Sequence, residues 1–256
     1  MRINNTIFLF FILFGFVFTS CKKDTESAID DSISENLKAL GVSAEDLLSN
    51  DIYKSMTVEL VYTQSYRPLQ ESIDAFKNFL TERVNKPDGI TYIERTIPDP
   101  SGFPFTLAEI KEIENQNRTE YTVGDNIAVY IFFSNGNSSS DTNTLKTLGS
   151  AYRNTSMVIY QKTLVEVSAS QGIILSTLEA TTLNHEFAHI FGLVNIQDDD
   201  IHQYHEDISH NKHCKVEGCL MYFESNSRSA QMLKGRSVLP QLDSLCVEDL
   251  QAKGGK

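Results

Sequence analysis

Apolar residues along the chain follow two different periods, and together they predict strands that alternate with helices. Alternating or continuous apolar runs rich in β-branched and aromatic residues predict strands, at residues 56–63, 89–97, 126–133, 145–152 and 156–161. Apolar residues three to four positions apart predict helices, at residues 68–84, 106–116, about 170 or 176 to 191, and 240–251. This alternation predicts an α/β fold with a twisted, mostly parallel sheet.

Local sequence signals give further detail on three of these elements. Thr106 and Glu109 are spaced as a capping box at the start of the second helix. The strand at residues 126–133 is apolar throughout, which predicts that both of its faces are covered. We expect the strand at residues 145–152 to lie at an edge of the sheet.

The first residues have the pattern of an export signal. Arg2 precedes a nearly apolar run, residues 7–18, that is too short to span a bilayer comfortably. The run ends in F-T-S ahead of Cys21, which resembles a bacterial lipobox. The resemblance implies cleavage before Cys21 and lipid on its thiol. It also implies a lipoprotein of the bacterial cell envelope, anchored in the outer membrane, with surface exposure as an option. An ordinary signal peptide with a chance cysteine is the alternative.

The chain then divides into three segments. Residues 1–20 form the lipoprotein signal peptide, and residues 21–54 form a lipid-anchored tether. A short helical segment in this tether ends before Gly41, and Ser43 begins a second helical turn. This piece is either a spacer or a segment that docks on the domain. Residues 55–256 form a single folded domain large enough to bury a substantial core.

Charge narrows the choice of partners. The formal net charge is −12, and loss of residues 1–20 removes only Arg2, so the mature chain carries −12 − 1 = −13. An acidic surface of this kind excludes nucleic acid and anionic lipid headgroups as partners held by surface charge. No second apolar run is long enough to span a membrane. We expect a monomer that meets the membrane through its N-terminal lipid.

Residues 185–193 carry the strongest chemical signal, H-E-x-x-H-x-x-G-L. On a helix, His185 and His189 lie on one face, one turn apart, and can bind one metal ion. Glu186 is offset by about 100°, which places its carboxylate beside the open position of the metal. Gly192 suits a helix end, because glycine readily adopts left-handed backbone angles. The pattern predicts the metal-binding helix of a zinc hydrolase.

A catalytic zinc ion usually has three protein ligands, so a third must come from elsewhere. Metzincins place a histidine three residues after the glycine, but that position here is Asn195, a poor zinc ligand. Downstream, H-C-x4-C-x-M begins at His213 and ends at Met221, which resembles the corresponding segment of archaemetzincins position by position. The eight-residue spacing from His213 to Met221 also resembles matrixins. His205 is the rival third ligand.

The resemblance to archaemetzincins and matrixins implies a metzincin-like zincin fold with a small C-terminal subdomain. In that fold His213 completes the zinc site after an insertion at residues 195–212. Met221 forms the Met-turn beneath the metal, and the last helix closes the subdomain. The combination with Cys21 is similar to membrane-anchored zinc peptidases of the Bacteroidetes type.

The expected function is that of a zinc-dependent endopeptidase with Zn²⁺ as its cofactor and a peptide or protein as its substrate. Glu186 acts as general base toward a metal-activated water. The substrate lies along the edge strand at residues 148–153, and Tyr222 lines its pocket. One alternative is a non-catalytic surface lipoprotein that binds a peptide or glycan. Another is a zinc hydrolase of a different specificity.

Three cysteines remain after Cys21 is assigned to lipid. An exported protein is in disulfide-permissive surroundings, which favours a disulfide between Cys214 and Cys219 and a free, buried Cys246. The archaemetzincin resemblance implies the alternative, a second structural zinc site. In that alternative Asp249, three residues after Cys246, takes the place of the last thiolate of a C-x-x-C pair.

Overall fold

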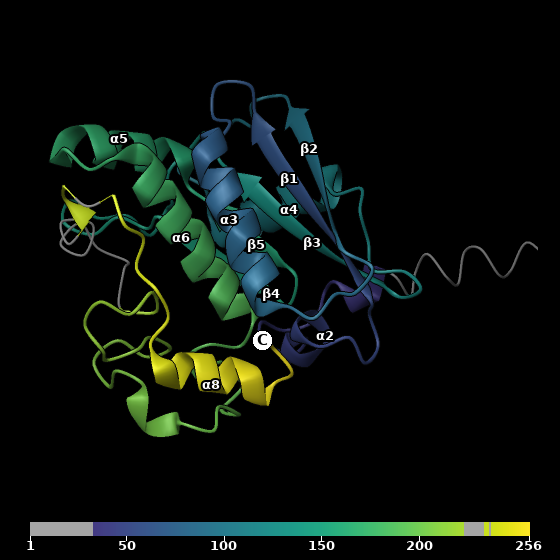
Figure 1. The fold of residues 1–256 in the computed structure, drawn as a ribbon. Helices are drawn as coiled ribbons and strands as arrows, with labels where there is room; N and C mark the ends of the chain where they lie inside the picture. Colours follow the sequence, from purple (N-terminus) through teal and green to yellow (C-terminus); the bar gives the residue numbers. More distant parts are fainter. Residues whose placement is uncertain (1–32, 223–232, 236) are drawn as a thin grey trace, which may run out of the picture.

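The computed structural model describes residues 33–222, 233–235 and 237–256 (Figure 1). Cys21 and the proposed signal peptide therefore lie outside the described residues. Twelve elements follow one another along the described chain, namely α2 Ala44–Leu48, β1 Ser55–Thr63, α3 Gln70–Arg83, β2 Ile90–Ile97, α4 Leu107–Asn117, β3 Asn126–Phe133, β4 Gly149–Arg153, β5 Ser156–Ile159, α5 Gln161–Gln171, α6 Leu175–Ile190, η1 Gln203–His205 and α8 Ser244–Ala252.

The strands form a five-stranded sheet in the order β2-β1-β3-β5-β4. The pairs β1–β2, β1–β3 and β3–β5 are parallel, and β4 pairs antiparallel with β5. Strand β3 lies at the centre, and every residue after Asn126 in it is buried, as its unbroken apolar run predicts. Strand β4 lies at the edge, as expected, so one of its sides is unpaired within the sheet.

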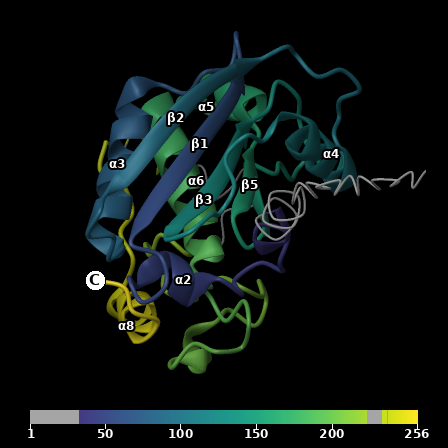
Figure 2. The ribbon, with the colours of Figure 1, turned by 90° about the vertical axis from the view of Figure 1, so that its right-hand side faces the viewer.

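Helices cover both faces of the sheet (Figures 1 and 2). Helices α3, α5 and α6 pack on one face, where the Phe76 and Phe187 rings meet edge to face with centroids 5.3 Å apart. Helix α4 covers the other face through Ile110 and Ile113, which pack with Tyr130 of β3. Its predicted capping box is present. The Thr106 hydroxyl accepts from the Glu109 main-chain N–H, and the Glu109 carboxylate accepts from the Thr106 main-chain N–H. The result is a three-layer arrangement with α6 held against the sheet.

The segment before β1 belongs to the folded unit. Asn36 is fully buried and its amide donates to Thr122, to the Ala128 carbonyl and to Thr155. Helix α2 buries Leu47 and Leu48 in the main core. The compact part of the chain therefore begins well before residue 55. Among the described residues, none of the helices has both the length and the apolar character needed to cross a bilayer.

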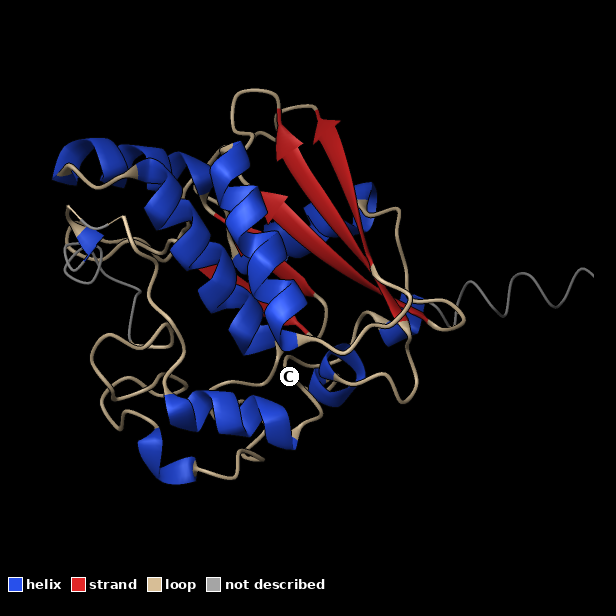
Figure 3. Cartoon of the chain, in the orientation of Figure 1, coloured by secondary structure: helices blue, strands red, loops and turns tan. Residues whose placement is uncertain are grey.

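The part of the chain after α6 forms a lobe made mostly of loops, with α8 as its main helix (Figure 3). Helix α8 starts at Ser244, later than the predicted residue 240, because the Asp243 side chain accepts from the Cys246 main-chain N–H and caps the helix there. Helix α5 differs from the prediction, because the sequence pattern places no element between the strand that ends at residue 161 and the metal-binding helix. The lobe faces the C-terminal half of α6.

Candidate metal centre

Helix α6 carries His185 and His189 on one face, and the main chain fixes both rings. His185 Nδ1 lies 2.8 Å from the Leu220 carbonyl oxygen, and His189 Nδ1 lies 2.6 Å from the Leu193 carbonyl oxygen. A carbonyl oxygen can only accept, so each Nδ1 carries the hydrogen. The Nε2 atom of each ring is therefore the nitrogen left to bind a metal. Helix α6 ends at Ile190, and Gly192 has the expected left-handed backbone with φ of +88°.

The chain returns to this helix at His213. The His213 ring centroid lies 5.3 Å from that of His185 and 5.2 Å from that of His189. One ligand nitrogen from each of the three rings lies within 4.8 Å of the others. His213 Nδ1 also lies 3.0 Å from a carbonyl oxygen, that of Asn211. The structure thus brings together the three histidines that the sequence analysis named.

The chemistry of this set suits zinc. Burial is the main cause that lowers the pKa of His185 to about 3, and nearby His213 contributes to the same shift. Burial also lowers the pKa values of His189 and His213. The rings are therefore neutral near pH 7 and present lone pairs rather than charges. Three imidazole nitrogens with a fourth position left open are a donor set typical of catalytic zinc.

Glu186 lies beside the three rings, as predicted. Its Oε2 accepts from the Ala151 N–H of β4 at 2.9 Å, and burial raises its pKa to about 8. A cavity of about 30 Å³ lies in front of it, between α6 and the start of β4, and Gly149 lines it. This space suits a water molecule. A β-carbon on Gly149 would lie 2.5 Å from Glu186 Cγ, so only glycine leaves room for the carboxylate there.

Met221, which the resemblance predicts to form the Met-turn, lies in the segment that follows His213. Met221 is fully buried, and its carbonyl accepts from the Cys214 N–H at 2.7 Å. The adjacent Leu220 supplies the carbonyl that orients His185. Tyr222 is half-buried and does not line the cavity at Glu186. Its role in a substrate pocket stays a prediction.

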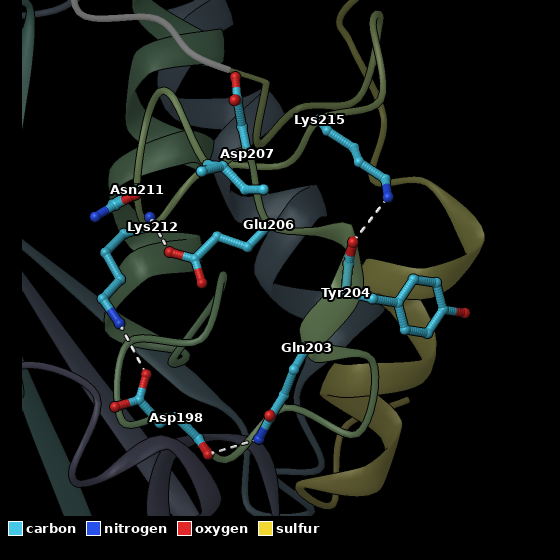
Figure 4. A pocket seen from close by; sticks show the side chains of 9 residues that line it. Asp198, Gln203, Tyr204, Glu206, Asp207, Asn211, Lys212 and Lys215 are labelled. Carbon is cyan, nitrogen blue, oxygen red and sulfur yellow. Dashed lines mark hydrogen bonds and ion pairs between the residues drawn. The ribbon is translucent and has the colours of Figure 1, made fainter.

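The insertion between Gly192 and His213 lines most of a cavity of about 740 Å³ (Figure 4). The charged side chains that line it bond either an opposite charge or the main chain of the insertion. Lys212 pairs with Asp198 at 3.1 Å and its main-chain N–H donates to Glu206 at 2.6 Å, while Lys215 Nζ donates to the Tyr204 carbonyl at 2.7 Å. None of the three histidines of the metal centre lines this cavity. The contacts of Lys212 connect parts of the insertion just before His213.

A second cluster lies in the lobe. Cys214, Cys219, Asp243 and Cys246 each offer a ligand atom within 4.8 Å of the others. All three thiols are free, so the predicted Cys214–Cys219 disulfide is not formed. The thiols instead converge with the carboxylate, which lies 3.0 Å from Cys214 Sγ. Hydrogen bonds from Cys214 and Cys246 lower the pKa of the Cys219 thiol, which favours its thiolate form.

The dimensions of this cluster fit a metal. Cys219 and Cys246 sulfurs lie 3.8 Å apart, and two thiolates about 2.3 Å from a tetrahedral zinc ion would be separated by roughly that distance. Asp249, the carboxylate expected in the second-zinc alternative, lies instead with Asp200 and His205, and Asp243 lies with the thiols. Asp243 was recognisable, since it precedes Cys246 by three residues, the spacing of a C-x-x-C pair.

The rival ligand His205 belongs to this second region. It is fully buried, and its Nε2 lies 3.4 Å from Cys246 Sγ, while its Nδ1 lies 3.6 Å from Asp249. It is not among the three histidines grouped on α6. Of the two candidates for a third ligand, only His213 reaches the pair on the helix.

Among the comparisons with known proteins, a solved structure supports the fold. No protein-family model matches the sequence, and no curated protein matches it. Among solved structures, the archaemetzincin of Methanopyrus kandleri is similar with 16% sequence identity and a TM-score of 0.51, over 78% of this chain and 96% of that chain. A zinc-dependent peptidase from Methanocorpusculum labreanum has 15% identity and a TM-score of 0.46, over 75% of this chain and 99% of that one. The chain therefore has an archaemetzincin-like α/β fold, with a twisted, mostly parallel five-stranded sheet.

Proposed function

We propose that the protein is a zinc-dependent endopeptidase. The observation that supports this most directly is the convergence of His185, His189 and His213 with the carboxylate of Glu186 beside them. Three neutral imidazoles would hold the ion, and a buried glutamate is the group that a hydrolase requires in addition. The similar solved structures include proteins described as an archaemetzincin and as a zinc-dependent peptidase.

When bound, zinc would supply a Lewis acid that lowers the pKa of water toward ~7 and polarises a carbonyl group. The protein itself contributes a general base, Glu186, which lines the same small cavity as His185 and His213. Glu186 accepts a proton from the attacking water and transfers it to the leaving amine.

The substrate would pair with β4. This strand is at the sheet edge, so its outer side can accept an extended peptide as an additional strand. Gly149 of β4 lines the cavity in front of Glu186, and the Ala151 N–H is bonded to that carboxylate. A peptide on β4 would therefore pass the metal centre with a main-chain carbonyl near it.

The second cluster would hold a structural zinc ion, as the archaemetzincin resemblance implies. Cys214, Cys219 and Cys246 supply thiolates, and Asp243 takes the remaining position. The cluster joins the segment after His213 to the start of α8. Such an ion would stabilise the lobe rather than take part in hydrolysis.

Location and assembly are further parts of the proposal. The F-T-S-Cys21 pattern supports a lipid anchor in the bacterial cell envelope. We propose a monomer that acts on peptides or proteins near the membrane and does not bind nucleic acid. A non-catalytic binding lipoprotein remains the alternative, although simple binding would not require Glu186 beside the histidines.

A glutamine substitution separates these two functions. Glu186→Gln preserves the shape and removes the base, so we expect cleavage of casein by the zinc-loaded protein to fall by a factor of about 10² or more, while bound zinc stays at the wild-type level. Glu112→Gln, on the exposed face of α4, is the matched control and should cleave normally. If zinc-loaded wild type cleaves no protein or peptide, the endopeptidase proposal fails and the binding alternative stands.

A further inference from the structure

Two groups of candidate metal ligands meet on one short segment of the chain. The histidine centre consists of His185, His189 and His213, and the cysteine cluster consists of Cys214, Cys219, Asp243 and Cys246. His213 is followed directly by Cys214. Cys219 is followed directly by Leu220, whose carbonyl oxygen accepts from His185 Nδ1 at 2.8 Å. Because groups of the two sites are neighbours in the chain, a displacement of the main chain at one site also displaces the other.

The Leu220 peptide group is held between the two sites. Its N–H donates to the Gln241 carbonyl oxygen at 2.8 Å, while its own carbonyl oxygen accepts from His185. Gln241 precedes Asp243 of the cysteine cluster by two residues. The position of the carbonyl group that orients His185 therefore depends on the segment that carries Asp243.

Two sulfur atoms of the cysteine cluster accept hydrogen bonds from the main chain around Leu220. The N–H groups of Met221 and Asp243 each lie 3.4 Å from Cys219 Sγ. The Val216 N–H lies 3.3 Å from Cys214 Sγ. The Cys214 N–H in turn donates to the Met221 carbonyl oxygen at 2.7 Å. These bonds close the segment between the two cysteines into one unit and join it to the segment before α8.

Metal binding at the cysteine cluster would strengthen this unit. Cys214 and Cys219 lie on one segment, and Asp243 and Cys246 lie on another, with Asp243 24 residues after Cys219. Hydrogen bonds to sulfur and burial join the two segments in the structure. Ligand bonds from both segments to one ion would join them more firmly, since a structural zinc ion contributes directly to the free energy of folding. Movement of the Leu220 carbonyl group would then be restricted.

We propose that the cysteine cluster positions the histidine centre. With a metal ion bound, the cluster holds the Leu220 carbonyl group and His213 in place and thereby raises the affinity of the three histidines for metal. This inference rests on the proposed zinc sites, and it adds a coupling between them. Coupling between two binding sites is reciprocal. Metal at the histidine centre therefore raises the metal affinity of the cysteine cluster by the same factor.

Cobalt binding measures the two sites separately. Co²⁺ bound by thiolates gives an intense charge-transfer absorption band, whereas Co²⁺ bound by imidazoles gives only weak visible bands. Cys246→Ser removes one ligand of the cysteine cluster from α8 and leaves the segment that carries His213 intact. We expect Co²⁺ to bind the histidine centre of this variant about tenfold more weakly than that of wild type. Unchanged affinity would overturn the proposal.

Asn36→Ala is the control for a general loss of stability. It removes buried hydrogen bonds to Thr122 and Thr155 and belongs to neither group of ligands. We expect it to keep the wild-type Co²⁺ affinity at both sites. An equal loss of affinity in Asn36→Ala and Cys246→Ser would show that lower stability is the cause, and would overturn the coupling.

A pair of histidine variants tests the reciprocal effect and its route, and does not depend on whether Cys246→Ser folds. His185→Gln removes the ring that bonds Leu220, whereas His189→Gln removes a ring that bonds the Leu193 carbonyl, outside the shared segment. We expect the Co²⁺ affinity of the cysteine cluster to fall about tenfold in His185→Gln and by less in His189→Gln. Equal affinities in the two variants would overturn the proposal. Each readout is metal binding, so it can fail while wild type cleaves protein and can succeed if wild type cleaves none.

Discussion

The orientation of each metal-centre histidine depends on a main-chain carbonyl group. Leu220, Leu193 and Asn211 supply these carbonyls, each from a turn that side-chain identity alone does not define. The i, i+4 spacing on α6 was therefore enough to predict one pair of ligands, but not how their rings are held. His213 was predicted through its resemblance to archaemetzincins, because nothing local in the sequence fixes where a loop returns.

The two candidate histidines should respond differently to mutation. His213→Ala leaves two imidazoles at the catalytic centre, so we expect zinc affinity there to fall by a factor of about 100 or more in a chelator titration. His205→Ala removes a ring that lies against Cys246 instead, and it should retain the zinc that supports cleavage. Equal loss of catalytic zinc in the two variants would show that the ligand assignment is wrong.

At the scale of elements, the periodicity of apolar residues predicted a strand or helix well where one face, or all, of the element is buried. Strand β3 has the predicted bounds, and the capping box at Thr106 marks the start of α4. Helix α5 was missed, because it has no side-chain cap at Tyr160 and carries β-branched residues such as Thr163 and Val167. These residues favour strands locally, and packing against α6 overrides that preference.

The fit between β4 and α6 gives a prediction at this scale. Gly149→Ala would place a β-carbon 2.5 Å from Glu186 Cγ and 3.0 Å from its Oε1. Either the strand or the carboxylate must move, so we expect kcat/KM to fall at least tenfold, with a loss of about 1–3 kcal/mol in the free energy of unfolding. Ser150→Ala, one residue along the same strand, is the control. Wild-type activity in Gly149→Ala would show that this contact does not position the base.

At the scale of the whole molecule, distant segments meet in ways that the sequence did not reveal. The cysteine cluster needs Asp243, which lies 24 residues after Cys219 in the sequence. A disulfide was the simpler expectation, because Cys214 and Cys219 are close in sequence. The resemblance to archaemetzincins implies a second metal site, but its carboxylate is Asp243, which precedes Cys246, and not Asp249, which follows it.

The N-terminal segment is the other long-range feature. Asn36 lies 86 or more residues from its side-chain partners Thr122 and Thr155, and its amide oxygen also accepts from the Thr122 N–H at 2.8 Å. It therefore ties the start of the described chain to the residues before β3 and to the turn before β5. Sequence patterns assigned this segment to a tether, because a single buried asparagine leaves no periodic signal.

This connection predicts that the segment stabilises the domain rather than spacing it from the membrane. Asn36→Ala would remove four side-chain hydrogen bonds and leave buried groups such as the Ala128 carbonyl with fewer partners. We expect the free energy of unfolding to fall by about 2–4 kcal/mol in urea denaturation, since each unsatisfied buried group costs about 1–3 kcal/mol. Leu37→Ala, at a side chain that is 47% exposed, should change it by less than about 1 kcal/mol. Equal stability of the two variants would mean that the folded unit begins later, near β1.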